Sequence, residues 1–358
     1  MLFHLLVPLA DTFSALNVFR YLTFRSIGAA LTALLIAFIV GPLLIRLLED
    51  RQLGQNVRED APDRHQEKTG TPTMGGVLIL FALIASTLLW SEWTNPFVWI
   101  VVGVTLGCGA VGLVDDYLNA VAKNPEGLRS RTKFLWLLGI AGAASTAMYL
   151  VPAFDAEISL PLFKELHPDI GWLYPLFAAI FIAGFSNAVN LTDGLDGLAI
   201  GPSMITAGVI GVFAYVVGNS VIAGYLDLKY VQSAGTLAIF CAALIGAGLG
   251  FLWFNTYPAS VFMGDTGALA LGGALATIAV IIRQEVVLIV AGGIFIVEMF
   301  SVIVQVISFR YTGKRVFAMA PIHHHYELKG WPEPQIIVRF WIVSIILALV
   351  SLSLLKLR

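Results

Sequence analysis

Long apolar runs recur from one end of this 358-residue chain to the other, and they limit its fold more than any other feature. The chain is 58% hydrophobic and 12% charged, which is about half the charge of an average soluble protein. Runs of about 17–25 apolar residues predict helices that cross a bilayer, because backbone groups in hydrocarbon must be hydrogen-bonded within the protein. A transmembrane β-barrel needs short alternating segments instead. The sequence therefore predicts an all-α polytopic integral membrane protein.

We expect ten spans within one domain of residues 1–358. Their approximate limits are 24–48, 74–91, 97–114, 133–150, 173–190, 195–217, 233–252, 267–282, 286–308 and 337–356. Residues 1–23 are predicted to form an interfacial arm. Residues 151–172, which contain three prolines, are predicted to form an external hairpin. Residues 309–336 are predicted to form a loop on the opposite side.

Five polar clusters interrupt the apolar runs. They are 68–73 (KTGTPT), 115–116 (DD), 187–197 (NAVNLTDGLDG), 255–267 (NTYPASVFMGDTG) and 323–325 (HHH). With ten spans, all five clusters lie on one side of the membrane. Fourteen of the 21 Lys and Arg residues lie in the loops of that side or their flanks, and seven lie on the other side. The positive-inside rule then predicts one cytoplasmic site and two periplasmic termini.

Asp115 and Asp116 end the third predicted span. Adjacent carboxylates repel each other, so either one is protonated or a cation lies between them. Carboxylates at a membrane are costly and usually functional. They could instead only cap the helix, although acidic side chains oppose the dipole at a helix C-terminus. We favour a functional pair.

Asn187, Asn190, Asp193 and Asp196 recur every three residues. If this stretch is helical, the four side chains form one polar stripe. Such a stripe could hydrogen-bond a sugar or a base, or coordinate Mg²⁺ through oxygen. The alternative is a helix break satisfied by its own side chains. So many polar groups between two apolar spans are expensive without a ligand, which favours binding.

Asp265 lies between Gly264 and Gly267 at the start of the eighth predicted span, and Thr73 precedes the second. Glycine lets a backbone approach a ligand closely, and a helix N-terminus offers free N–H groups to phosphate. Either residue could equally be only an N-cap. Lys68 and Thr73 together are a weak signal of anion binding.

His323, His324 and His325 lie in a loop between prolines. Consecutive residues cannot easily face one metal, and no Cys or HExxH motif accompanies them. Binding of phosphate or another polar substrate is therefore favoured over a zinc site or a solvated loop.

Some polar or reactive residues lie inside predicted spans. Glu298 and Gln305 are two helical turns apart and share a face, so interhelical bonding and a role at the site are both open. Cys108 and Cys241 are expected to be small buried hydrophobes. The net charge of −2 gives no reason to expect a nucleic-acid partner.

Together the clusters bring acidic oxygen ligands, amides and basic groups to one membrane face. Hard oxygen ligands favour Mg²⁺ over zinc. Carboxylates, Mg²⁺ and phosphate-binding donors are the groups that phosphoryl transfer requires. A site at a membrane implies a lipid substrate. The residues therefore predict a Mg²⁺-dependent enzyme that joins a phosphorylated compound to a membrane lipid.

The clusters also resemble a known family. The strings KTGTPTMGG, GLVDDY, NAVNLTDGLDGL, FLWFNTYPASVFMGDTG and APIHHHYELKGWPEP are similar to those of phospho-N-acetylmuramoyl-pentapeptide transferases. These enzymes are a branch of the polyprenyl-phosphate N-acetylhexosamine-1-phosphate transferases. The resemblance covers nearly the whole chain, and the PIHHHYE loop points to the muramoyl-pentapeptide branch.

The resemblance implies a homodimer in the bacterial inner membrane, with Mg²⁺ as cofactor. Its substrates would be UDP-MurNAc-pentapeptide and undecaprenyl phosphate, and its products UMP and lipid I. Asp265 would bind Mg²⁺, and Asp115 and Asp116 would be the essential pair, acting either as base or as covalent nucleophile. Residues expected to contact the substrate are Lys68, Thr73, Asn187, Asn190, Asp193, Asp196, Asn255, Phe262, Gly264, His323, His324 and His325.

Three other functions stay open at this point. The first is a related transferase that uses UDP-GlcNAc. The second is an ion-coupled transporter, which would place its carboxylates near the bilayer midplane rather than at one face. The third is a lipid-binding scaffold, which would leave the acidic cluster unexplained.

Overall fold

The structure, a computed structural model, describes residues 1–51, 70–120, 127–151, 154, 156–159 and 168–356. The regular secondary structure of this part is helical, apart from isolated β-bridges, and turns and loops connect the helices. The long helices are α2 (Leu22–Asp50), α4 (Gly76–Trp90), α5 (Pro96–Ala120), α6 (Ser130–Tyr149), α7 (Tyr174–Thr192), α8 (Ile200–Val217), α10 (Leu237–Asn255), α11 (Gly264–Ile281), α13 (Gly293–Thr312) and α15 (Glu333–Ser353). The short helices are α1 (Leu2–Leu6), α9 (Ser220–Tyr225), α12 (Glu285–Ala291) and α14 (Ile322–Leu328).

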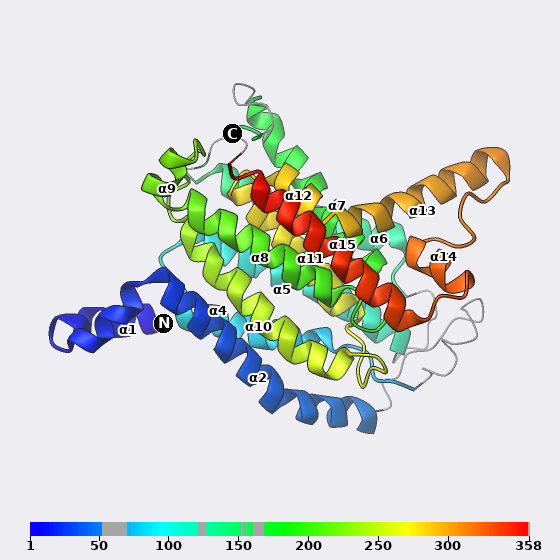
Figure 1. Cartoon of the computed structure of the whole chain (residues 1–358), viewed down its shortest axis with the longest axis horizontal. Helices are drawn as coiled ribbons and strands as arrows, with labels where there is room; N and C mark the ends of the chain where they lie inside the picture. Colours follow the sequence, from blue (N-terminus) through cyan, green and yellow to red (C-terminus); the bar gives the residue numbers. More distant parts are fainter. Residues whose placement is uncertain (52–69, 121–126, 152–153, 155, 160–167, 357–358) are drawn as a thin grey trace.

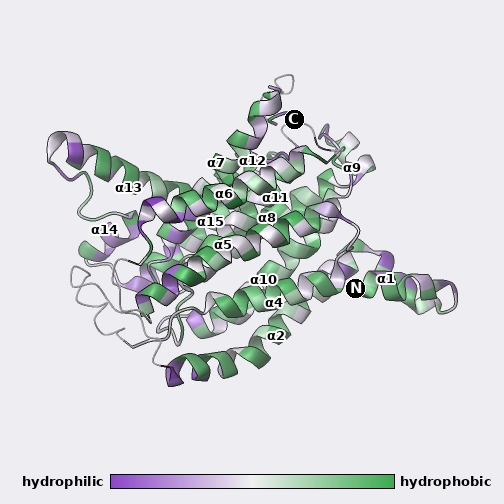
Figure 2. Cartoon of the chain, turned by 180° about the vertical axis from the view of Figure 1, so that it is seen from behind, coloured by the Kyte–Doolittle hydropathy of each residue, from purple (hydrophilic) through white to green (hydrophobic). Residues whose placement is uncertain are grey.

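Eight helices of the described part are long and apolar enough to cross a membrane. The other two long helices are α4, an apolar helix of 15 residues, and the less apolar α6. Apolar residues cover the length of the helices, and hydrophilic residues gather near α14 (Figure 2). The prediction of an all-α polytopic membrane protein is confirmed.

The ten predicted spans each match a helix, with two corrections. The predicted span 286–308 is broken at Gly292, where α12 ends and α13 begins one residue later. Two adjacent glycines weaken a helix, and a Cβ at Gly292 would also meet the Phe185 ring at 2.7 Å. The span predicted to begin at residue 195 begins at Ile200 instead, because residues 193–199 form turns.

Helix α11 forms the centre of the bundle. All residues from Thr266 to Ile281 are buried, and α5, α7 and α8 pack around them. Most are Gly, Ala or aliphatic, and small residues let neighbouring helices approach closely. Cys108 lies against Gly273 of α11 and Cys241 against Gly211 of α8, and both free cysteines are buried as expected.

Glycines fix the distance between neighbouring helices at several points. A Cβ at Gly112 of α5 would meet the backbone of Asp265 at the start of α11. A Cβ at Gly246 of α10 would meet the backbone carbonyl of Ala30 in α2. These contacts join helices that lie far apart in the sequence.

The segment predicted as an external hairpin contains an antiparallel bridge between Glu157 and Asp169. The Ile158 N–H donates to the Pro168 carbonyl at 3.1 Å, and the Ile170 N–H donates to the Ala156 carbonyl at 3.3 Å. Figure 1 places the start of α2 and the end of α15 at the end of the bundle away from α14.

We predict that Gly246→Ala lowers the midpoint of thermal unfolding, because the added methyl meets the Ala30 backbone, which cannot rotate away. Overpacking of this kind costs about 1–3 kcal/mol. The matched control is Gly103→Ala in α5, where a Cβ meets nothing within 4 Å. Thermal unfolding in detergent should show a loss for the first variant and no loss for the second. Equal midpoints would contradict the packing of α10 on α2.

Candidate active site

The Asp116 carboxylate, at the end of α5, binds the first turn of α11. It accepts hydrogen bonds from the Asp265 N–H at 3.0 Å, the Thr266 N–H at 3.0 Å and the Thr266 hydroxyl at 2.6 Å. The N–H groups of a first helical turn have no partner inside the helix, so a carboxylate is well placed there. Gly264 has a φ of +71°, and a Cβ on it would meet Asp116 Oδ2 at 2.6 Å. Glycine is therefore required where the two helices meet.

Asp115 and Asp265 share one cation, the ammonium group of Lys133. This lysine lies in the first turn of α6, with its Nζ 3.0 Å from Asp115 Oδ2 and in a short ion pair with Asp265 Oδ2. Asp115 Oδ1 also accepts from the Leu128 N–H. Asp265 Oδ1 accepts from the Asn190 amide at 2.6 Å. Carboxylates from α5 and α11, an amide from α7 and an ammonium from α6 therefore converge at one point.

The predicted polar stripe is only partly helical. Helix α7 carries Asn187 and Asn190, both half-buried, but it ends at Thr192. Asp193 and Asp196 lie in the turn that follows, so they do not continue the stripe. Loss of hydration, together with the nearby carboxyls of Asp265, Asp116 and Asp196, raises the pKa of Asp193 well above its ordinary value.

Asp196 and Asn255 connect this turn to the loop before α11. Asp196 Oδ2 accepts from the Ala259 N–H at 3.0 Å. The Asn255 side chain accepts from the Gly197 N–H at 2.9 Å and donates to the Val261 carbonyl at 2.8 Å. Both side chains are buried. They hold the two polar loops together, whether or not they also contact a substrate.

The segment before α4 pairs with the segment before α11. The Phe262 N–H donates to the Pro72 carbonyl, and the Gly75 N–H donates to the Phe262 carbonyl, both at 2.8 Å. Thr73 is buried beside this pairing, and Phe262 is half-buried. Lys68 lies outside the residues that the structure describes. The pairing brings the described end of the first polar cluster, 68–73, to the start of α11.

The three histidines have different surroundings in α14. His323 is fully buried, with its Nδ1 3.1 Å from Glu298 Oε1. His324 Nδ1 lies 2.6 Å from the Glu327 carboxylate. His325 Nδ1 accepts from the Ala318 N–H at 3.0 Å. His324 and His325 are half-buried, so they are more accessible than His323.

Sequence reasoning missed the roles of Lys133 and Thr266. It counted Lys133 only as a basic residue near a membrane end. The available signal was its position at the start of a span, on the same side as Asp115 and Asp265. Thr266 directly follows Asp265, but its hydroxyl is assigned to Asp116 only by the packing of α5 on α11.

The residues present suit a single hard cation better than a closed metal cage. No group of three or more His, Cys, Asp or Glu in the described ranges has an arrangement that could hold a metal ion. However, Asp115 and Asp265 are close enough for one ammonium to contact both. Mg²⁺ commonly binds one or two carboxylates and completes its shell with substrate phosphates and water. The pair fits that pattern.

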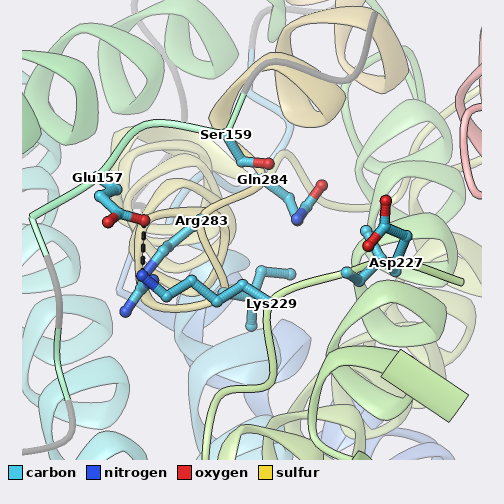
Figure 3. Close-up of a pocket in the computed structure, with 8 residues that line it drawn as sticks. Glu157, Ser159, Asp227, Lys229, Arg283 and Gln284 are labelled. Carbon is cyan, nitrogen blue, oxygen red and sulfur yellow. Dashed lines mark hydrogen bonds and ion pairs between the residues drawn. The ribbon is translucent and has the colours of Figure 1, made fainter. Parts of the chain in front are cut away.

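A separate polar pocket of about 350 Å³ lies beyond the other end of α11 (Figure 3). Its lining includes Glu157, Asp227, Lys229 and Arg283, and it contains no residue predicted for the site. Lys229 and Glu157 form an ion pair of 2.6 Å across it. None of the described site residues therefore lines this pocket at the far end of α11.

The fold and the site together define an integral membrane protein with a carboxylate and lysine centre at one end of its helices. Residues 98–283 match the family described as Glycosyl transferase family 4. Residues 68–80 match signature 1 of the phospho-N-acetylmuramoyl-pentapeptide-transferases.

Relatives of about the same length match this chain from end to end. Phospho-N-acetylmuramoyl-pentapeptide-transferases from Geobacter sp. (strain M21), Citrifermentans bemidjiense and Desulfatibacillum aliphaticivorans are 56%, 55% and 55% identical to this chain. Each match covers 100% of both sequences. The chain belongs to the phospho-N-acetylmuramoyl-pentapeptide-transferase family, so the resemblance inferred from its motifs is confirmed.

We predict that Asp116→Asn lowers the midpoint of thermal unfolding. A carboxamide has one acceptor oxygen and would turn its NH₂ group toward donors of α11, which costs about 1–3 kcal/mol. The control is Asp11→Asn, which removes only an exposed ion pair with Arg20 and should change little. If Asp116→Asn unfolds at the wild-type temperature, Asp116 does not hold α11.

Proposed function

We propose that this protein transfers phospho-MurNAc-pentapeptide from UDP-MurNAc-pentapeptide to undecaprenyl phosphate. The products are lipid I and UMP, and the reaction is the first membrane step of peptidoglycan synthesis. Family membership over the whole length supports this proposal. The observation that carries the chemistry is the shared contact of Lys133 with Asp115 and Asp265, at the end of helices that otherwise bury apolar residues.

The site has the charge pattern that a diphosphate donor needs. An oxygen of the lipid phosphate attacks the sugar-linked phosphorus, a new P–O bond forms, and the bond to the UMP phosphate breaks. Charge on the phosphate oxygens must be neutralised as this happens. Lys133 supplies one positive charge at the required place. Asp265 would hold Mg²⁺, which supplies further positive charge to phosphate when bound.

Asp115 and Asp116 differ in what their carboxylates contact. Asp116 accepts three hydrogen bonds from the start of α11, so we assign it to positioning Asp265. Asp115 contacts one backbone N–H and the side-chain ammonium of Lys133, so it is better placed to orient the attacking lipid phosphate or accept its proton. We assign the donor subsite to Asn187, Asn190 and Asp193, with Phe262 stacking on uracil.

We propose that the site faces the cytoplasm of a bacterium and that both termini are periplasmic. The distribution of 14 basic residues against seven supports this orientation. A soluble nucleotide-linked donor is also made and kept on the cytoplasmic side, whereas the lipid acceptor reaches the site from the bilayer. A homodimer is proposed from family resemblance alone.

The chief competing reaction uses UDP-GlcNAc with the same chemistry. We predict that purified protein with undecaprenyl phosphate and Mg²⁺ releases UMP from UDP-MurNAc-pentapeptide, and that EDTA stops the release. Chromatography would detect UMP, and a labelled donor would reveal the lipid product. Release from UDP-GlcNAc alone would keep the chemistry and change the branch. No release from either donor, by folded protein supplied with lipid, would contradict transfer.

The alternative function, an ion-coupled transporter, is less well supported. Within α11, the polar side chains after Asp265 are only Thr266 and Thr277, and the helix is buried up to Ile281. This central helix thus offers no line of polar groups from one end of the bundle to the other.

We predict that Asp115→Asn and Asp265→Asn each reduce UMP release to background while the protein stays folded. Each variant removes a charge that the transferred phosphate or its cation requires. Turnover within tenfold of wild type would remove that residue from the chemistry. Far-ultraviolet circular dichroism and thermal unfolding would establish that the variants are folded.

We predict that Lys133→Met lowers turnover by about 100-fold or more, because removing a charge that stabilises the transition state has effects of that size. The matched control is Lys229→Met, which breaks an ion pair in the pocket at the opposite end of the bundle. The control should turn over within about twofold of wild type. Equal activity of the two variants would exclude a catalytic role for Lys133.

A further inference from the structure

Glu298 is a fully buried carboxylate in α13, and both of its oxygens bind α14. Oε2 accepts from the Ile322 N–H at 2.8 Å, and Oε1 lies 3.1 Å from His323 Nδ1. Neither side chain is exposed to solvent. A buried carboxylate is costly, and an apolar residue of similar size often gives equal or better stability. The position therefore calls for a reason beyond stability.

The contact with Glu298 sets the protonation pattern of the His323 ring. An ionised carboxylate only accepts hydrogen bonds, so the ring must donate from Nδ1. In the neutral ring, Nε2 is then the unprotonated nitrogen. Nε2 is buried and has no hydrogen-bond partner within the described residues. One histidine nitrogen is thus fixed by Glu298, and the other is turned toward the next element.

That next element is the turn that carries Asp193. A Cβ at Gly194 would collide with His323 Nε2 and would lie 2.9 Å from Cε1. The ring of His323 also packs on that of His324, with centroids 4.1 Å apart. His323 therefore lies between the accessible histidines of α14 and the Asp193–Gly194 turn.

We propose that Glu298 is a positioning residue of the transferase, acting through His323. It holds His323 as the Nδ1–H tautomer and presses it against Gly194. This fixes the separation between His324 and His325 on one side and Asp193 on the other. The proposal rests on the proposed function, because Asp193 is assigned to the donor subsite and His324 and His325 are expected to contact the substrate. Glu298 is fully buried, so it acts through His323 rather than on the substrate itself.

The geometry identifies Glu298→Gln as the most informative variant. A glutamine has one acceptor oxygen, which can keep the bond from the Ile322 N–H. Its NH₂ group then faces His323 Nδ1, and the ring must accept there and carry its proton on Nε2. The variant is nearly the same size as the wild type, so it changes the tautomer without creating a cavity.

The first test is nuclear magnetic resonance of protein labelled with ¹⁵N-histidine. His323→Asn would assign the His323 signals among the six histidines. We expect a protonated Nδ1 and an unprotonated Nε2 in the wild type, and the reverse in Glu298→Gln. The same tautomer in both proteins would overturn the proposal. This readout needs no activity, so it stands even if the proposed function fails.

The second test separates donor binding from folding. Displacement of subsite groups by about an ångström can cost up to about 100-fold. We expect Glu298→Gln to raise KM for the UDP-linked donor about tenfold and to leave KM for undecaprenyl phosphate within about twofold. The matched control is Ser301→Ala, in the next turn of α13, which removes a buried hydrogen bond to the Glu298 carbonyl without touching His323.

The control should lower stability without changing either KM or the tautomer. If Glu298→Gln lowers stability as Ser301→Ala does and leaves donor KM unchanged, Glu298 is only structural. Gly194→Ala provides a check from the other side of the ring, because its methyl would push on the same nitrogen. The double variant Gly194→Ala/Glu298→Gln should raise KM for the donor by less than the product of the two single-variant effects. Fully multiplicative effects would contradict a shared contact.

Discussion

The hydrogen bonds between the Asp116 carboxylate and the first turn of α11 join the residues that α5 and α11 contribute to the site. Three donors at the start of α11 converge on this one side chain from α5. Because the donors include the N–H of Asp265 itself, Asp116 sets where the Asp265 carboxylate points. From that point the Lys133 ammonium reaches both Asp265 and Asp115, and the Asn190 amide closes the group from α7. Four helices thus depend on one capping interaction.

This arrangement is possible because small residues line the approach. Gly112 on α5 lies against the backbone of Asp265, and Gly264 takes a positive φ beside Asp116. The same device acts where Gly76 of α4 meets Gly267. A bilayer gives helices little hydrophobic reason to associate, so close backbone packing and buried hydrogen bonds must supply specificity. The site is built from those interactions rather than added to a finished bundle.

Much of the fold, and the meeting of polar clusters at one end of the bundle, could be predicted from the sequence, but the contacts among these residues could not. Apolar runs of helical length identify spans directly, and polar clusters between them mark a common face. The contact of Asp116 with Thr266 joins residues 150 positions apart, and no spacing rule describes such a pair. The same holds for Lys133 and Asp265. The predicted span 173–190 ends close to Thr192, where α7 ends. The spacing alone could not decide whether Asp193 and Asp196 continue the helix, because a three-residue repeat fits a helix and a turn rich in Asn, Asp and Gly equally well. Glu298 and Gln305 do share a face, since one binds Ile322 and the other the Phe317 backbone. Only the structure shows that the segment containing Phe317 and Ile322 covers that face.

The site as a whole accounts for transfer of a phosphorylated sugar to a lipid through charge placement at a membrane surface. Carboxylates that repel each other are held together by a lysine, and this gathers the groups that we propose bind a cation and the diphosphate. The most direct measurement is a crystal structure with Mn²⁺ in place of Mg²⁺ and UDP-MurNAc-pentapeptide, without lipid acceptor. We predict an anomalous manganese peak coordinated by Asp265, with the donor diphosphate beside it and Lys133 no longer bridging Asp115 and Asp265. A manganese peak remote from Asp265, or a donor bound away from the turn at Asp193, would contradict the site described above.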